Sequence, residues 1–167
     1  MHRSFVALAL AGAIGAASAQ YIPMPQADWK EVEAPPPPAL STRGLIPLEI
    51  TGSSLRFGVD PASVTVAGDG VVRYVVVATS SSGTTNAMYE GIRCSSGEVK
   101  VYARHNPDSG WVPLRNAEWQ PLQNRPNSRH SLTVARTGAC IGQGPSGSAS
   151  EIVRALRTGP DMRFQPR

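Results

Sequence analysis

The 167-residue chain lacks a hydrophobic run long enough to cross a bilayer. Its one compact apolar stretch, Phe5–Ile14, is shorter than the roughly 20 residues that a membrane-spanning helix needs. That stretch follows Arg3 and precedes Ala17-Ser18-Ala19, the charged start and small-residue cleavage pattern of a secretory signal. We expect residues 1–19 to be a signal peptide cleaved near Ala19; the alternative is an uncleaved anchor. No transmembrane segment is expected after cleavage, and the mature protein is expected in the periplasm or secreted.

Lysine is scarce, at two residues against fourteen arginines. The positive residues are scattered singly, without the basic clusters and interleaved aromatics of a nucleic-acid groove. Because the positive residues are scattered and the protein is expected to be exported, we expect no nucleic-acid partner. The arginine surplus has two interpretations. It reflects genomic base composition, or it serves to bind carboxylates or phosphates, which the planar guanidinium contacts through two parallel hydrogen bonds.

Metal-binding and catalytic motifs are also missing. The three histidines show no H-x-x-x-H spacing, and the two cysteines form no close pair, so neither pattern predicts a metal site. The turn Gly68-Asp69-Gly70 lacks the lysine and helix of a phosphate-binding loop. Residues 144–148, GPSGS, are out of register for a nucleophile elbow. We expect no cofactor and no bound metal, and the balance favours a protein that is not an enzyme.

Proline concentrates in residues 20–43, where four consecutive prolines, Pro35–Pro38, favour an extended polyproline II segment. We expect residues 20–43 to be a disordered, proline-rich tether. The alternative is a docking arm in which Trp29 and Val32 lie against the domain. Residues 44–167 are then expected to form a single α+β domain.

From Leu45 the sequence has the pattern of strands. LIPLEI is apolar and bounded by glycines, and two β-branched runs flank Gly68-Asp69-Gly70, which is a strong hairpin signal. Val71–Thr79 is apolar almost throughout, which predicts a central strand covered on both faces. Two further strands are expected at 86–94 and 98–104. Together these segments predict an antiparallel β-meander of about four to five strands.

The last hairpin has a predicted register. A two-residue turn at Ser96-Gly97 places Cys94 opposite Val99 and Ile92 opposite Val101, which gathers four apolar residues on one face. The opposite face is a candidate binding surface made of Tyr89, Arg93, Lys100, Tyr102 and Arg104. Aromatic and arginine residues are favoured at binding hot spots. The alternative is an ordinary solvated face, or one covered by the C-terminal helix.

The second half of the chain predicts one or two C-terminal helices. In SASEIVRALRTG, Ser148 or Ser150 is a capping residue, an apolar stripe follows, and Gly159 comes after the end. In RHSLTVARTGACIG, Leu132, Ala135 and Ala139 recur at helical spacing, although its Thr and Val also fit a strand. PDSGWVPLRNAEWQPL is expected to be an ordered loop or a short helix. The expected fold is α+β, with the helices against one face of the sheet.

Several of these segments resemble the cryptic neisserial protein (CNP-like) family: LRFGVDPASVTV, GVVRYVVVA, NAMYEGIRC, VKVYAR, EWQPL and EIVRALR. The most specific string is Tyr89–Cys94, and the resemblance runs from about Leu45 to Arg157. It implies an exported protein of Gram-negative bacteria. It implies no reaction and no catalytic residue.

Cys94 and Cys140 are the only cysteines. In an exported chain two cysteines most often pair, and the predicted register points Cys94 into the core beside Val99, so we expect one disulfide. The alternative makes Cys94 a thiolate nucleophile activated by His105 or His130.

Glu90 is the sharpest polar feature, because alternation along its strand points it into the interior. His105 is expected diagonally across the hairpin on the same face, where the two form either an acid–base pair or a satisfied structural pair. The first hypothesis is an exported, non-enzymatic binding or structural module whose partner is an envelope protein or a cell-wall component. The alternative is a small hydrolase that acts on an envelope polymer through Glu90 and His105.

Overall fold

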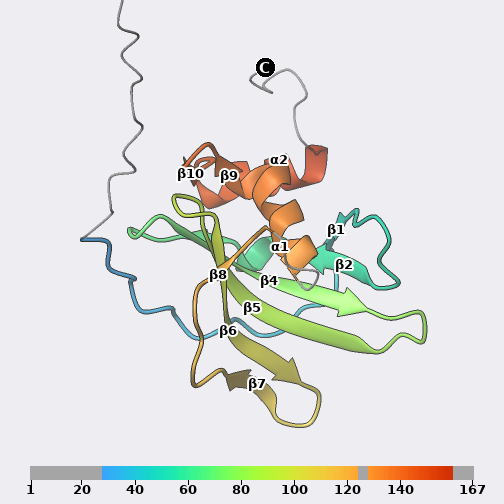
Figure 1. Ribbon diagram of the computed structural model, residues 1–167. Helices are drawn as coiled ribbons and strands as arrows, with labels where there is room; N and C mark the ends of the chain where they lie inside the picture. Colours follow the sequence, from blue (N-terminus) through green and yellow to red (C-terminus); the bar gives the residue numbers. More distant parts are fainter. Residues whose placement is uncertain (1–27, 124–127, 160–167) are drawn as a thin grey trace, which may run out of the picture.

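The structure is a computed structural model that describes residues 28–123 and 128–159, so the expected signal peptide lies outside the described residues. The main sheet contains β1 (Ile46–Leu48), β2 (Arg56–Val59), β3 (Thr65–Val66), β4 (Val71–Thr79), β5 (Thr85–Arg93), β6 (Glu98–Asn106), β7 (Gly110–Pro113) and β8 (Gln120–Pro121). The C-terminal part contains α1 (Arg129–Val134), a π-helical turn (Ala135–Ala139), the hairpin β9 (Cys140–Ile141) and β10 (Gly144–Pro145), and α2 (Ala149–Thr158). The expected α+β class is confirmed (Figure 1).

The sheet is antiparallel and is built around the meander β4-β5-β6. Its strand order is β1-β2-β4-β5-β6-β7, with β3 paired to β4 and β8 paired to β6. The predicted turn at 68–70 joins β3 to β4, and Gly70 takes a φ of 75° that favours glycine. Strand β4 consists mainly of valine, whose branched side chain suits a pleated sheet. It is buried from Val71 to Ala78, as expected for a central strand covered on both faces.

The register of the β5–β6 hairpin differs from the predicted one. Ile92 pairs with Val99 rather than Val101, so four residues instead of two form the turn. A β-bulge follows, because Glu90 pairs with Val101 while the preceding residue, Tyr89, pairs with Ala103. Tyr102 is the extra residue. One inserted residue turns every later side chain of its strand to the other face of the sheet. Arg104 therefore lies on the face predicted for His105, and His105 on the face predicted for Arg104.

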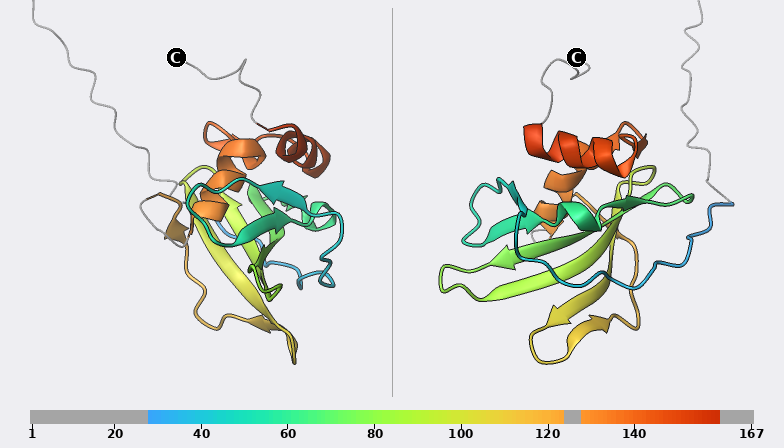
Figure 2. Two further views of the ribbon diagram at one scale, coloured as in Figure 1. Left: turned by 90° about the vertical axis from the view of Figure 1, so that its right-hand side faces the viewer. Right: turned by 180° about the vertical axis from the view of Figure 1, so that it is seen from behind.

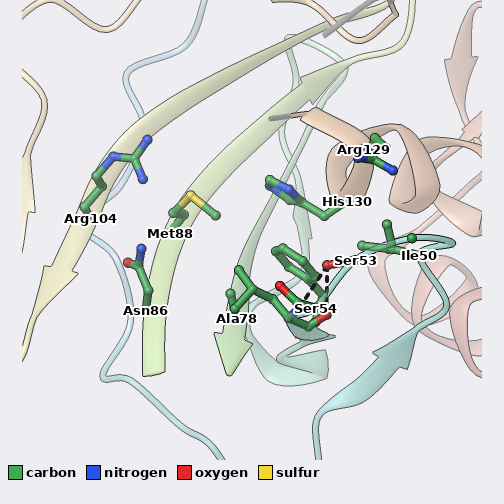
Figure 3. A pocket seen from close by; sticks show the side chains of 12 residues that line it. Ile50, Ser53, Ser54, Ala78, Asn86, Met88, Arg104, Arg129 and His130 are labelled. Carbon is green, nitrogen blue, oxygen red and sulfur yellow. Dashed lines mark hydrogen bonds between the residues drawn. The ribbon is translucent and has the colours of Figure 1, made fainter. Parts of the chain in front are cut away.

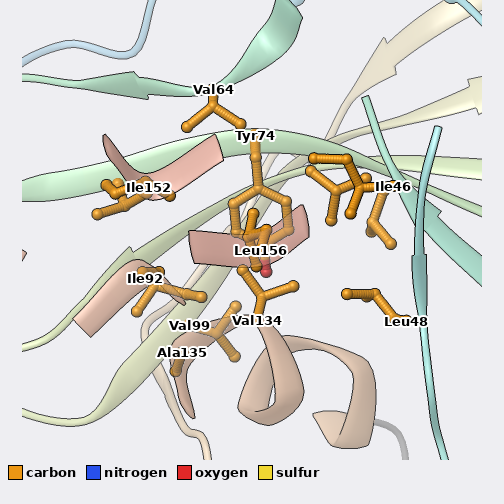
Figure 4. Close-up of a cluster of buried hydrophobic side chains, with 14 of the residues drawn as sticks. Ile46, Leu48, Val64, Tyr74, Ile92, Val99, Val134, Ala135, Ile152 and Leu156 are labelled. Carbon is orange, nitrogen blue, oxygen red and sulfur yellow. The ribbon is translucent and has the colours of Figure 1, made fainter. Parts of the chain in front are cut away.

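Helices α1 and α2 cover one face of the sheet and enclose the main core, where Tyr74, Ile92 and Ile152 are completely buried (Figure 4). The predicted caps of α2 are confirmed. Ser148 begins the helix with a reciprocal pair of hydrogen bonds to Glu151, and Gly159 ends it with a φ of 75°. The segment at 129–139 is helical as expected.

The opposite face of the sheet is covered by residues 28–43, which we call the N-terminal arm (Figure 2). Trp29 Nε1 donates to the carbonyl of Asp69 at 2.9 Å, and Asp69 Oδ2 accepts from the amide of Val32 at 2.9 Å. Farther along, Trp111 Nε1 donates to the carbonyl of Pro38 at 2.8 Å. The arm closes a second core that contains Val75, Val77, Ala87, Tyr89 and Ala103. Residues 28–43 therefore lie against the domain as the docking-arm alternative has it, rather than as a disordered tether. Trp29 packs there, whereas Val32 contributes only its backbone and its side chain is 49 % exposed.

The segment around Trp111 is neither a helix nor a simple loop. Residues 110–113 form β7 against the end of β6, and residues 120–121 return as β8 beside its start. The tryptophans Trp111 and Trp119 lie close to the arm, so this segment supports the arm as well as extending the sheet.

Candidate functional site

Glu90 lies on β5 and points into the interior, as predicted, with 1 % of its surface exposed. Its Oε2 accepts from Tyr74 Oη at 2.8 Å and from Ser131 Oγ at 2.9 Å. Its Oε1 is hydrogen-bonded to His130 Nε2 at 2.9 Å. Both carboxyl oxygens are thus engaged by groups of the protein itself, as a buried carboxyl requires.

Helix α1 delivers two of these partners. His130 and Ser131 are neighbours in its first turn, and Val134 and Ala135, one turn later, pack into the main core. Residues four apart lie on one helix face, so the apolar pair anchors the face that presents the polar pair to Glu90.

Tyr74 is the partner from the sheet, directly opposite Glu90 in the β4–β5 pairing. Burial, and then the charge of Glu90, raise the pKa of Tyr74 well above its ordinary value. The hydroxyl therefore stays protonated and donates to the carboxylate.

The predicted pair of Glu90 and His105 is wrong. The bulge turns His105 to the opposite face of the sheet, where its ring meets Trp111 edge-on at 5.2 Å between centroids. The histidine that reaches Glu90 is His130, forty residues farther along the chain.

A cleft of about 460 Å³ opens beside His130, between the sheet and the loop that follows β1 (Figure 3). We call it the arginine cleft, and it is lined by Ile50, residues 52–55, Phe57, Ala78, Asn86, Met88, Arg104, Arg129 and His130. The ring of His130 stacks on Phe57, with centroids 5.0 Å apart and planes within 6°. His130 Nδ1 has no hydrogen-bond partner within the described residues. It is the one polar atom of the Glu90 cluster without an internal partner.

A second pocket, of about 340 Å³, adjoins the arginine cleft and shares Met88, Arg104 and His130 with it. Glu90 of β5 lines it together with residues of the 114–120 segment. Glu90 is almost fully enclosed, and internal hydrogen bonds occupy three of the roughly four acceptor positions of its carboxyl group.

The predicted binding surface on the opposite face is occupied by the N-terminal arm. Glu31 Oε2 accepts from Lys100 Nζ at 2.9 Å and from Trp119 Nε1 at 3.1 Å, and Glu31 Oε1 accepts from Tyr102 Oη at 2.8 Å. Four predicted members are therefore covered or engaged: Tyr89 is 2 % exposed, Arg93 lies over the Trp29 ring, and Lys100 and Tyr102 bind Glu31. The fifth, Arg104, lies on the other face in the arginine cleft.

Two carboxyls where the arm meets the domain, Glu31 and Asp69, have lowered pKa values. Burial alone raises the pKa of Glu31, but hydrogen bonds from Lys100, Tyr102 and Trp119 outweigh it and hold the pKa below its ordinary value. For Asp69, burial is likewise outweighed, chiefly by Arg73, whose guanidinium lies 2.8 Å from the carboxylate. The ionised form of both carboxyls is therefore favoured at neutral pH, and each accepts a hydrogen bond that holds the arm: Glu31 from Lys100, and Asp69 from the amide of Val32.

Cys94 and Cys140 form the expected disulfide, which closes a separation of 46 residues and joins the β5–β6 turn to the end of the π-helical turn. The thiolate-nucleophile alternative is therefore wrong. No group of three or more His, Cys, Asp or Glu side chains that could hold a metal ion occurs in the described part of the chain.

The sequence did not predict three residues as hydrogen-bond partners of Glu90: Tyr74, His130 and Ser131. Tyr74 carried a signal, because it is the one polar residue among the valines of β4 that faces the same core as Glu90. Polar side chains at 130 and 131, on the buried face of a helix, were a second signal that a buried carboxyl lay nearby.

Together these features define an α+β domain braced by one disulfide, with helices over one face of its sheet and its own arm over the other. Disulfides are characteristic of proteins in oxidising, extracytoplasmic compartments. Within residues 28–123 and 128–159, no helix combines the length and apolar character needed to span a membrane.

The chain belongs to the CNP1-like family, whose model matches residues 24–157. It is also similar to cryptic neisserial protein 1 of Neisseria gonorrhoeae (strain ATCC 700825 / FA 1090), with 26 % identity over 157 residues, covering 81 % of this chain and 77 % of that protein. No solved structure matches the chain with significance. The family resemblance is thus confirmed, and the match includes the N-terminal arm.

Proposed function

We propose that the protein is a non-enzymatic binding module of the bacterial cell envelope and that the arginine cleft is its ligand site. The observation that supports this most is the enclosure of Glu90 beside an open cleft. Both carboxyl oxygens are hydrogen-bonded inside the fold, to Tyr74, His130 and Ser131, which is the arrangement of a structural group. The adjacent cleft offers cationic, polar and apolar side chains instead.

Placement in the envelope rests on two supports. The Cys94–Cys140 disulfide is typical of an oxidising compartment. The N-terminal sequence has the pattern of a signal peptide, which would direct the mature chain to the periplasm or beyond. The partner we propose is an envelope protein or a cell-wall component that places one chemical group in the cleft.

The assignment of the cleft is tested with two neighbouring tryptophan variants. Asn86 and Thr85 are adjacent, exposed residues of β5 whose side chains point to opposite faces of the sheet, and only Asn86 lines the cleft. Asn86→Trp fills the cleft, whereas Thr85→Trp adds the same bulk outside it.

Mature protein and both variants are mixed with washed cell envelopes, and the bound fraction is measured after sedimentation. We expect saturable binding that Asn86→Trp abolishes and Thr85→Trp retains. Equal binding by the two variants would contradict the cleft as the ligand site.

A further inference from the structure

We propose that the arginine cleft binds an oxyanion, a carboxylate or a phosphate, attached to an apolar group, with Arg104 and Arg129 as the residues that contact the charge. This inference rests on the proposed function, in which the cleft is the ligand site, and it adds the chemical class of the ligand.

The charge of the cleft is one-sided. Arg104 and Arg129 line it, and no aspartate or glutamate belongs to its lining; Glu90 and Glu118 line the adjoining pocket instead. Figure 3 shows Arg104 and Asn86 on one side, Arg129 on the other, and Met88 and His130 between them. A concave site with a positive side chain on each side attracts an anion and raises its local concentration.

Arg104 is a guanidinium without an internal partner. Of the described arginines, Arg73 and Arg93 form ion pairs, with Asp69 and Glu98, and the exposed arginines, Arg104 among them, do not. Arg104 is exposed and makes no hydrogen bond or ion pair with any described residue. The β-bulge at Tyr102 is what places it here, since without the extra residue its side chain would lie on the face covered by the arm.

Arg129 is positioned from the other side by a single contact. Its Nη1 donates to the carbonyl of Thr51 at 3.0 Å, which holds the guanidinium against the loop after β1. A guanidinium has five N–H donors, so one such contact leaves donors for a carboxylate or phosphate.

The floor between the arginines is apolar. Phe57, Ala78 and Met88 line it from three strands, and Ile50 and Leu55 line it from the loop. His130, whose Nε2 is bonded to Glu90, stacks on Phe57 beside this floor. Binding sites with an apolar lining and a few placed polar groups select ligands that have both characters.

Benzoate, phenyl phosphate and the neutral benzamide are suitable probes, followed by NMR of protein labelled with ¹³C at methionine methyl groups. Met88 is the methionine of the cleft floor and is the reporter. We expect both anions to shift the Met88 signal in a saturable, salt-sensitive manner and benzamide to do so far more weakly. The ratio of the dissociation constants of benzoate and phenyl phosphate tells which oxyanion the cleft prefers.

Arg104→Gln and Arg129→Gln are each expected to weaken anion binding about tenfold, the effect of losing one hydrogen bond between charged groups. Arg136→Gln, an exposed arginine outside both pockets, is the control and should bind as the unmodified protein does. An equal response to benzamide and benzoate would overturn the oxyanion inference and leave the cleft as a ligand site. A Met88 signal that no probe shifts would overturn both the oxyanion inference and the assignment of the cleft as a ligand site.

Discussion

Replacing Glu31 with alanine tests whether the N-terminal arm belongs to the folded domain. Glu31 accepts three hydrogen bonds, from Lys100, Tyr102 and Trp119, at 2.8 to 3.1 Å. Each such bond contributes about 1 kcal/mol or somewhat more. The side chains of Glu31 and Lys100 remain 21 % and 17 % exposed, so water replaces part of what is lost. We therefore expect the free energy of unfolding to fall by about 2–3 kcal/mol.

The assay is thermal and urea denaturation of the mature protein, followed by tryptophan fluorescence and circular dichroism. A loss of this size lowers the Tm by about 5–10 °C for a chain of this length. Glu33→Ala is the matched control, because Glu33 is an exposed carboxylate of the same arm without a hydrogen bond or ion pair to any described residue. Equal melting of the two variants would refute the docked arm.

The same contact predicts a pH dependence. The pKa of Glu31 is lower in the folded state than its ordinary value, because three hydrogen-bond donors stabilise the ionised carboxylate. A carboxyl of this kind stabilises the fold above its unfolded pKa, and the stabilisation disappears as the pH falls through its folded pKa. The stability difference between the unmodified protein and Glu31→Ala should therefore be constant near neutral pH and shrink below about pH 4.

Three further predictions concern the core. Replacing Cys94 or Cys140 with serine should lower stability by about 2–5 kcal/mol, by a similar amount for each since they share one bridge, and the unmodified protein should show no thiol on titration under denaturing conditions. Glu90→Ala should lower the free energy of unfolding in urea by about 3–5 kcal/mol, because it leaves three buried partners without their acceptor. Glu90→Gln keeps the shape of the side chain and should cost clearly less. Equal losses for the two variants would contradict the structural role of Glu90. Gly91→Ala should cost about 1–3 kcal/mol, because a Cβ there would lie 2.8 Å from the ring of Tyr102, and unchanged urea denaturation would show that this ring moves aside freely.

The sequence was informative where one local pattern decided the structure. Alternating or continuous apolar runs predicted the meander, the glycine-flanked turn at 68–70 predicted its first hairpin, and the serine and glycine caps predicted α2. The disulfide was predicted from the two cysteines together with the expectation of export.

The candidate site was harder to predict because it depends on one residue. The bulge at Tyr102 exchanges the faces of Arg104 and His105, so it separates His105 from Glu90 and brings Arg104 to the cleft. Nothing in the residue pattern of β6 requires a bulge. The docked arm was only the alternative prediction for a related reason, since its stability comes from contacts with residues far along the chain, such as Lys100 and Trp119, rather than from its own composition.

The proposed non-enzymatic function is tested most directly by product analysis. Washed cell envelopes are incubated with the mature protein at saturating binding, and the soluble fraction is examined by mass spectrometry against envelopes without protein. The binding-module account predicts that the protein is retained on the envelopes and that no new soluble fragment is formed. Fragments that the unmodified protein releases, and that a folded Glu90→Gln variant does not, would contradict it and make the protein a hydrolase.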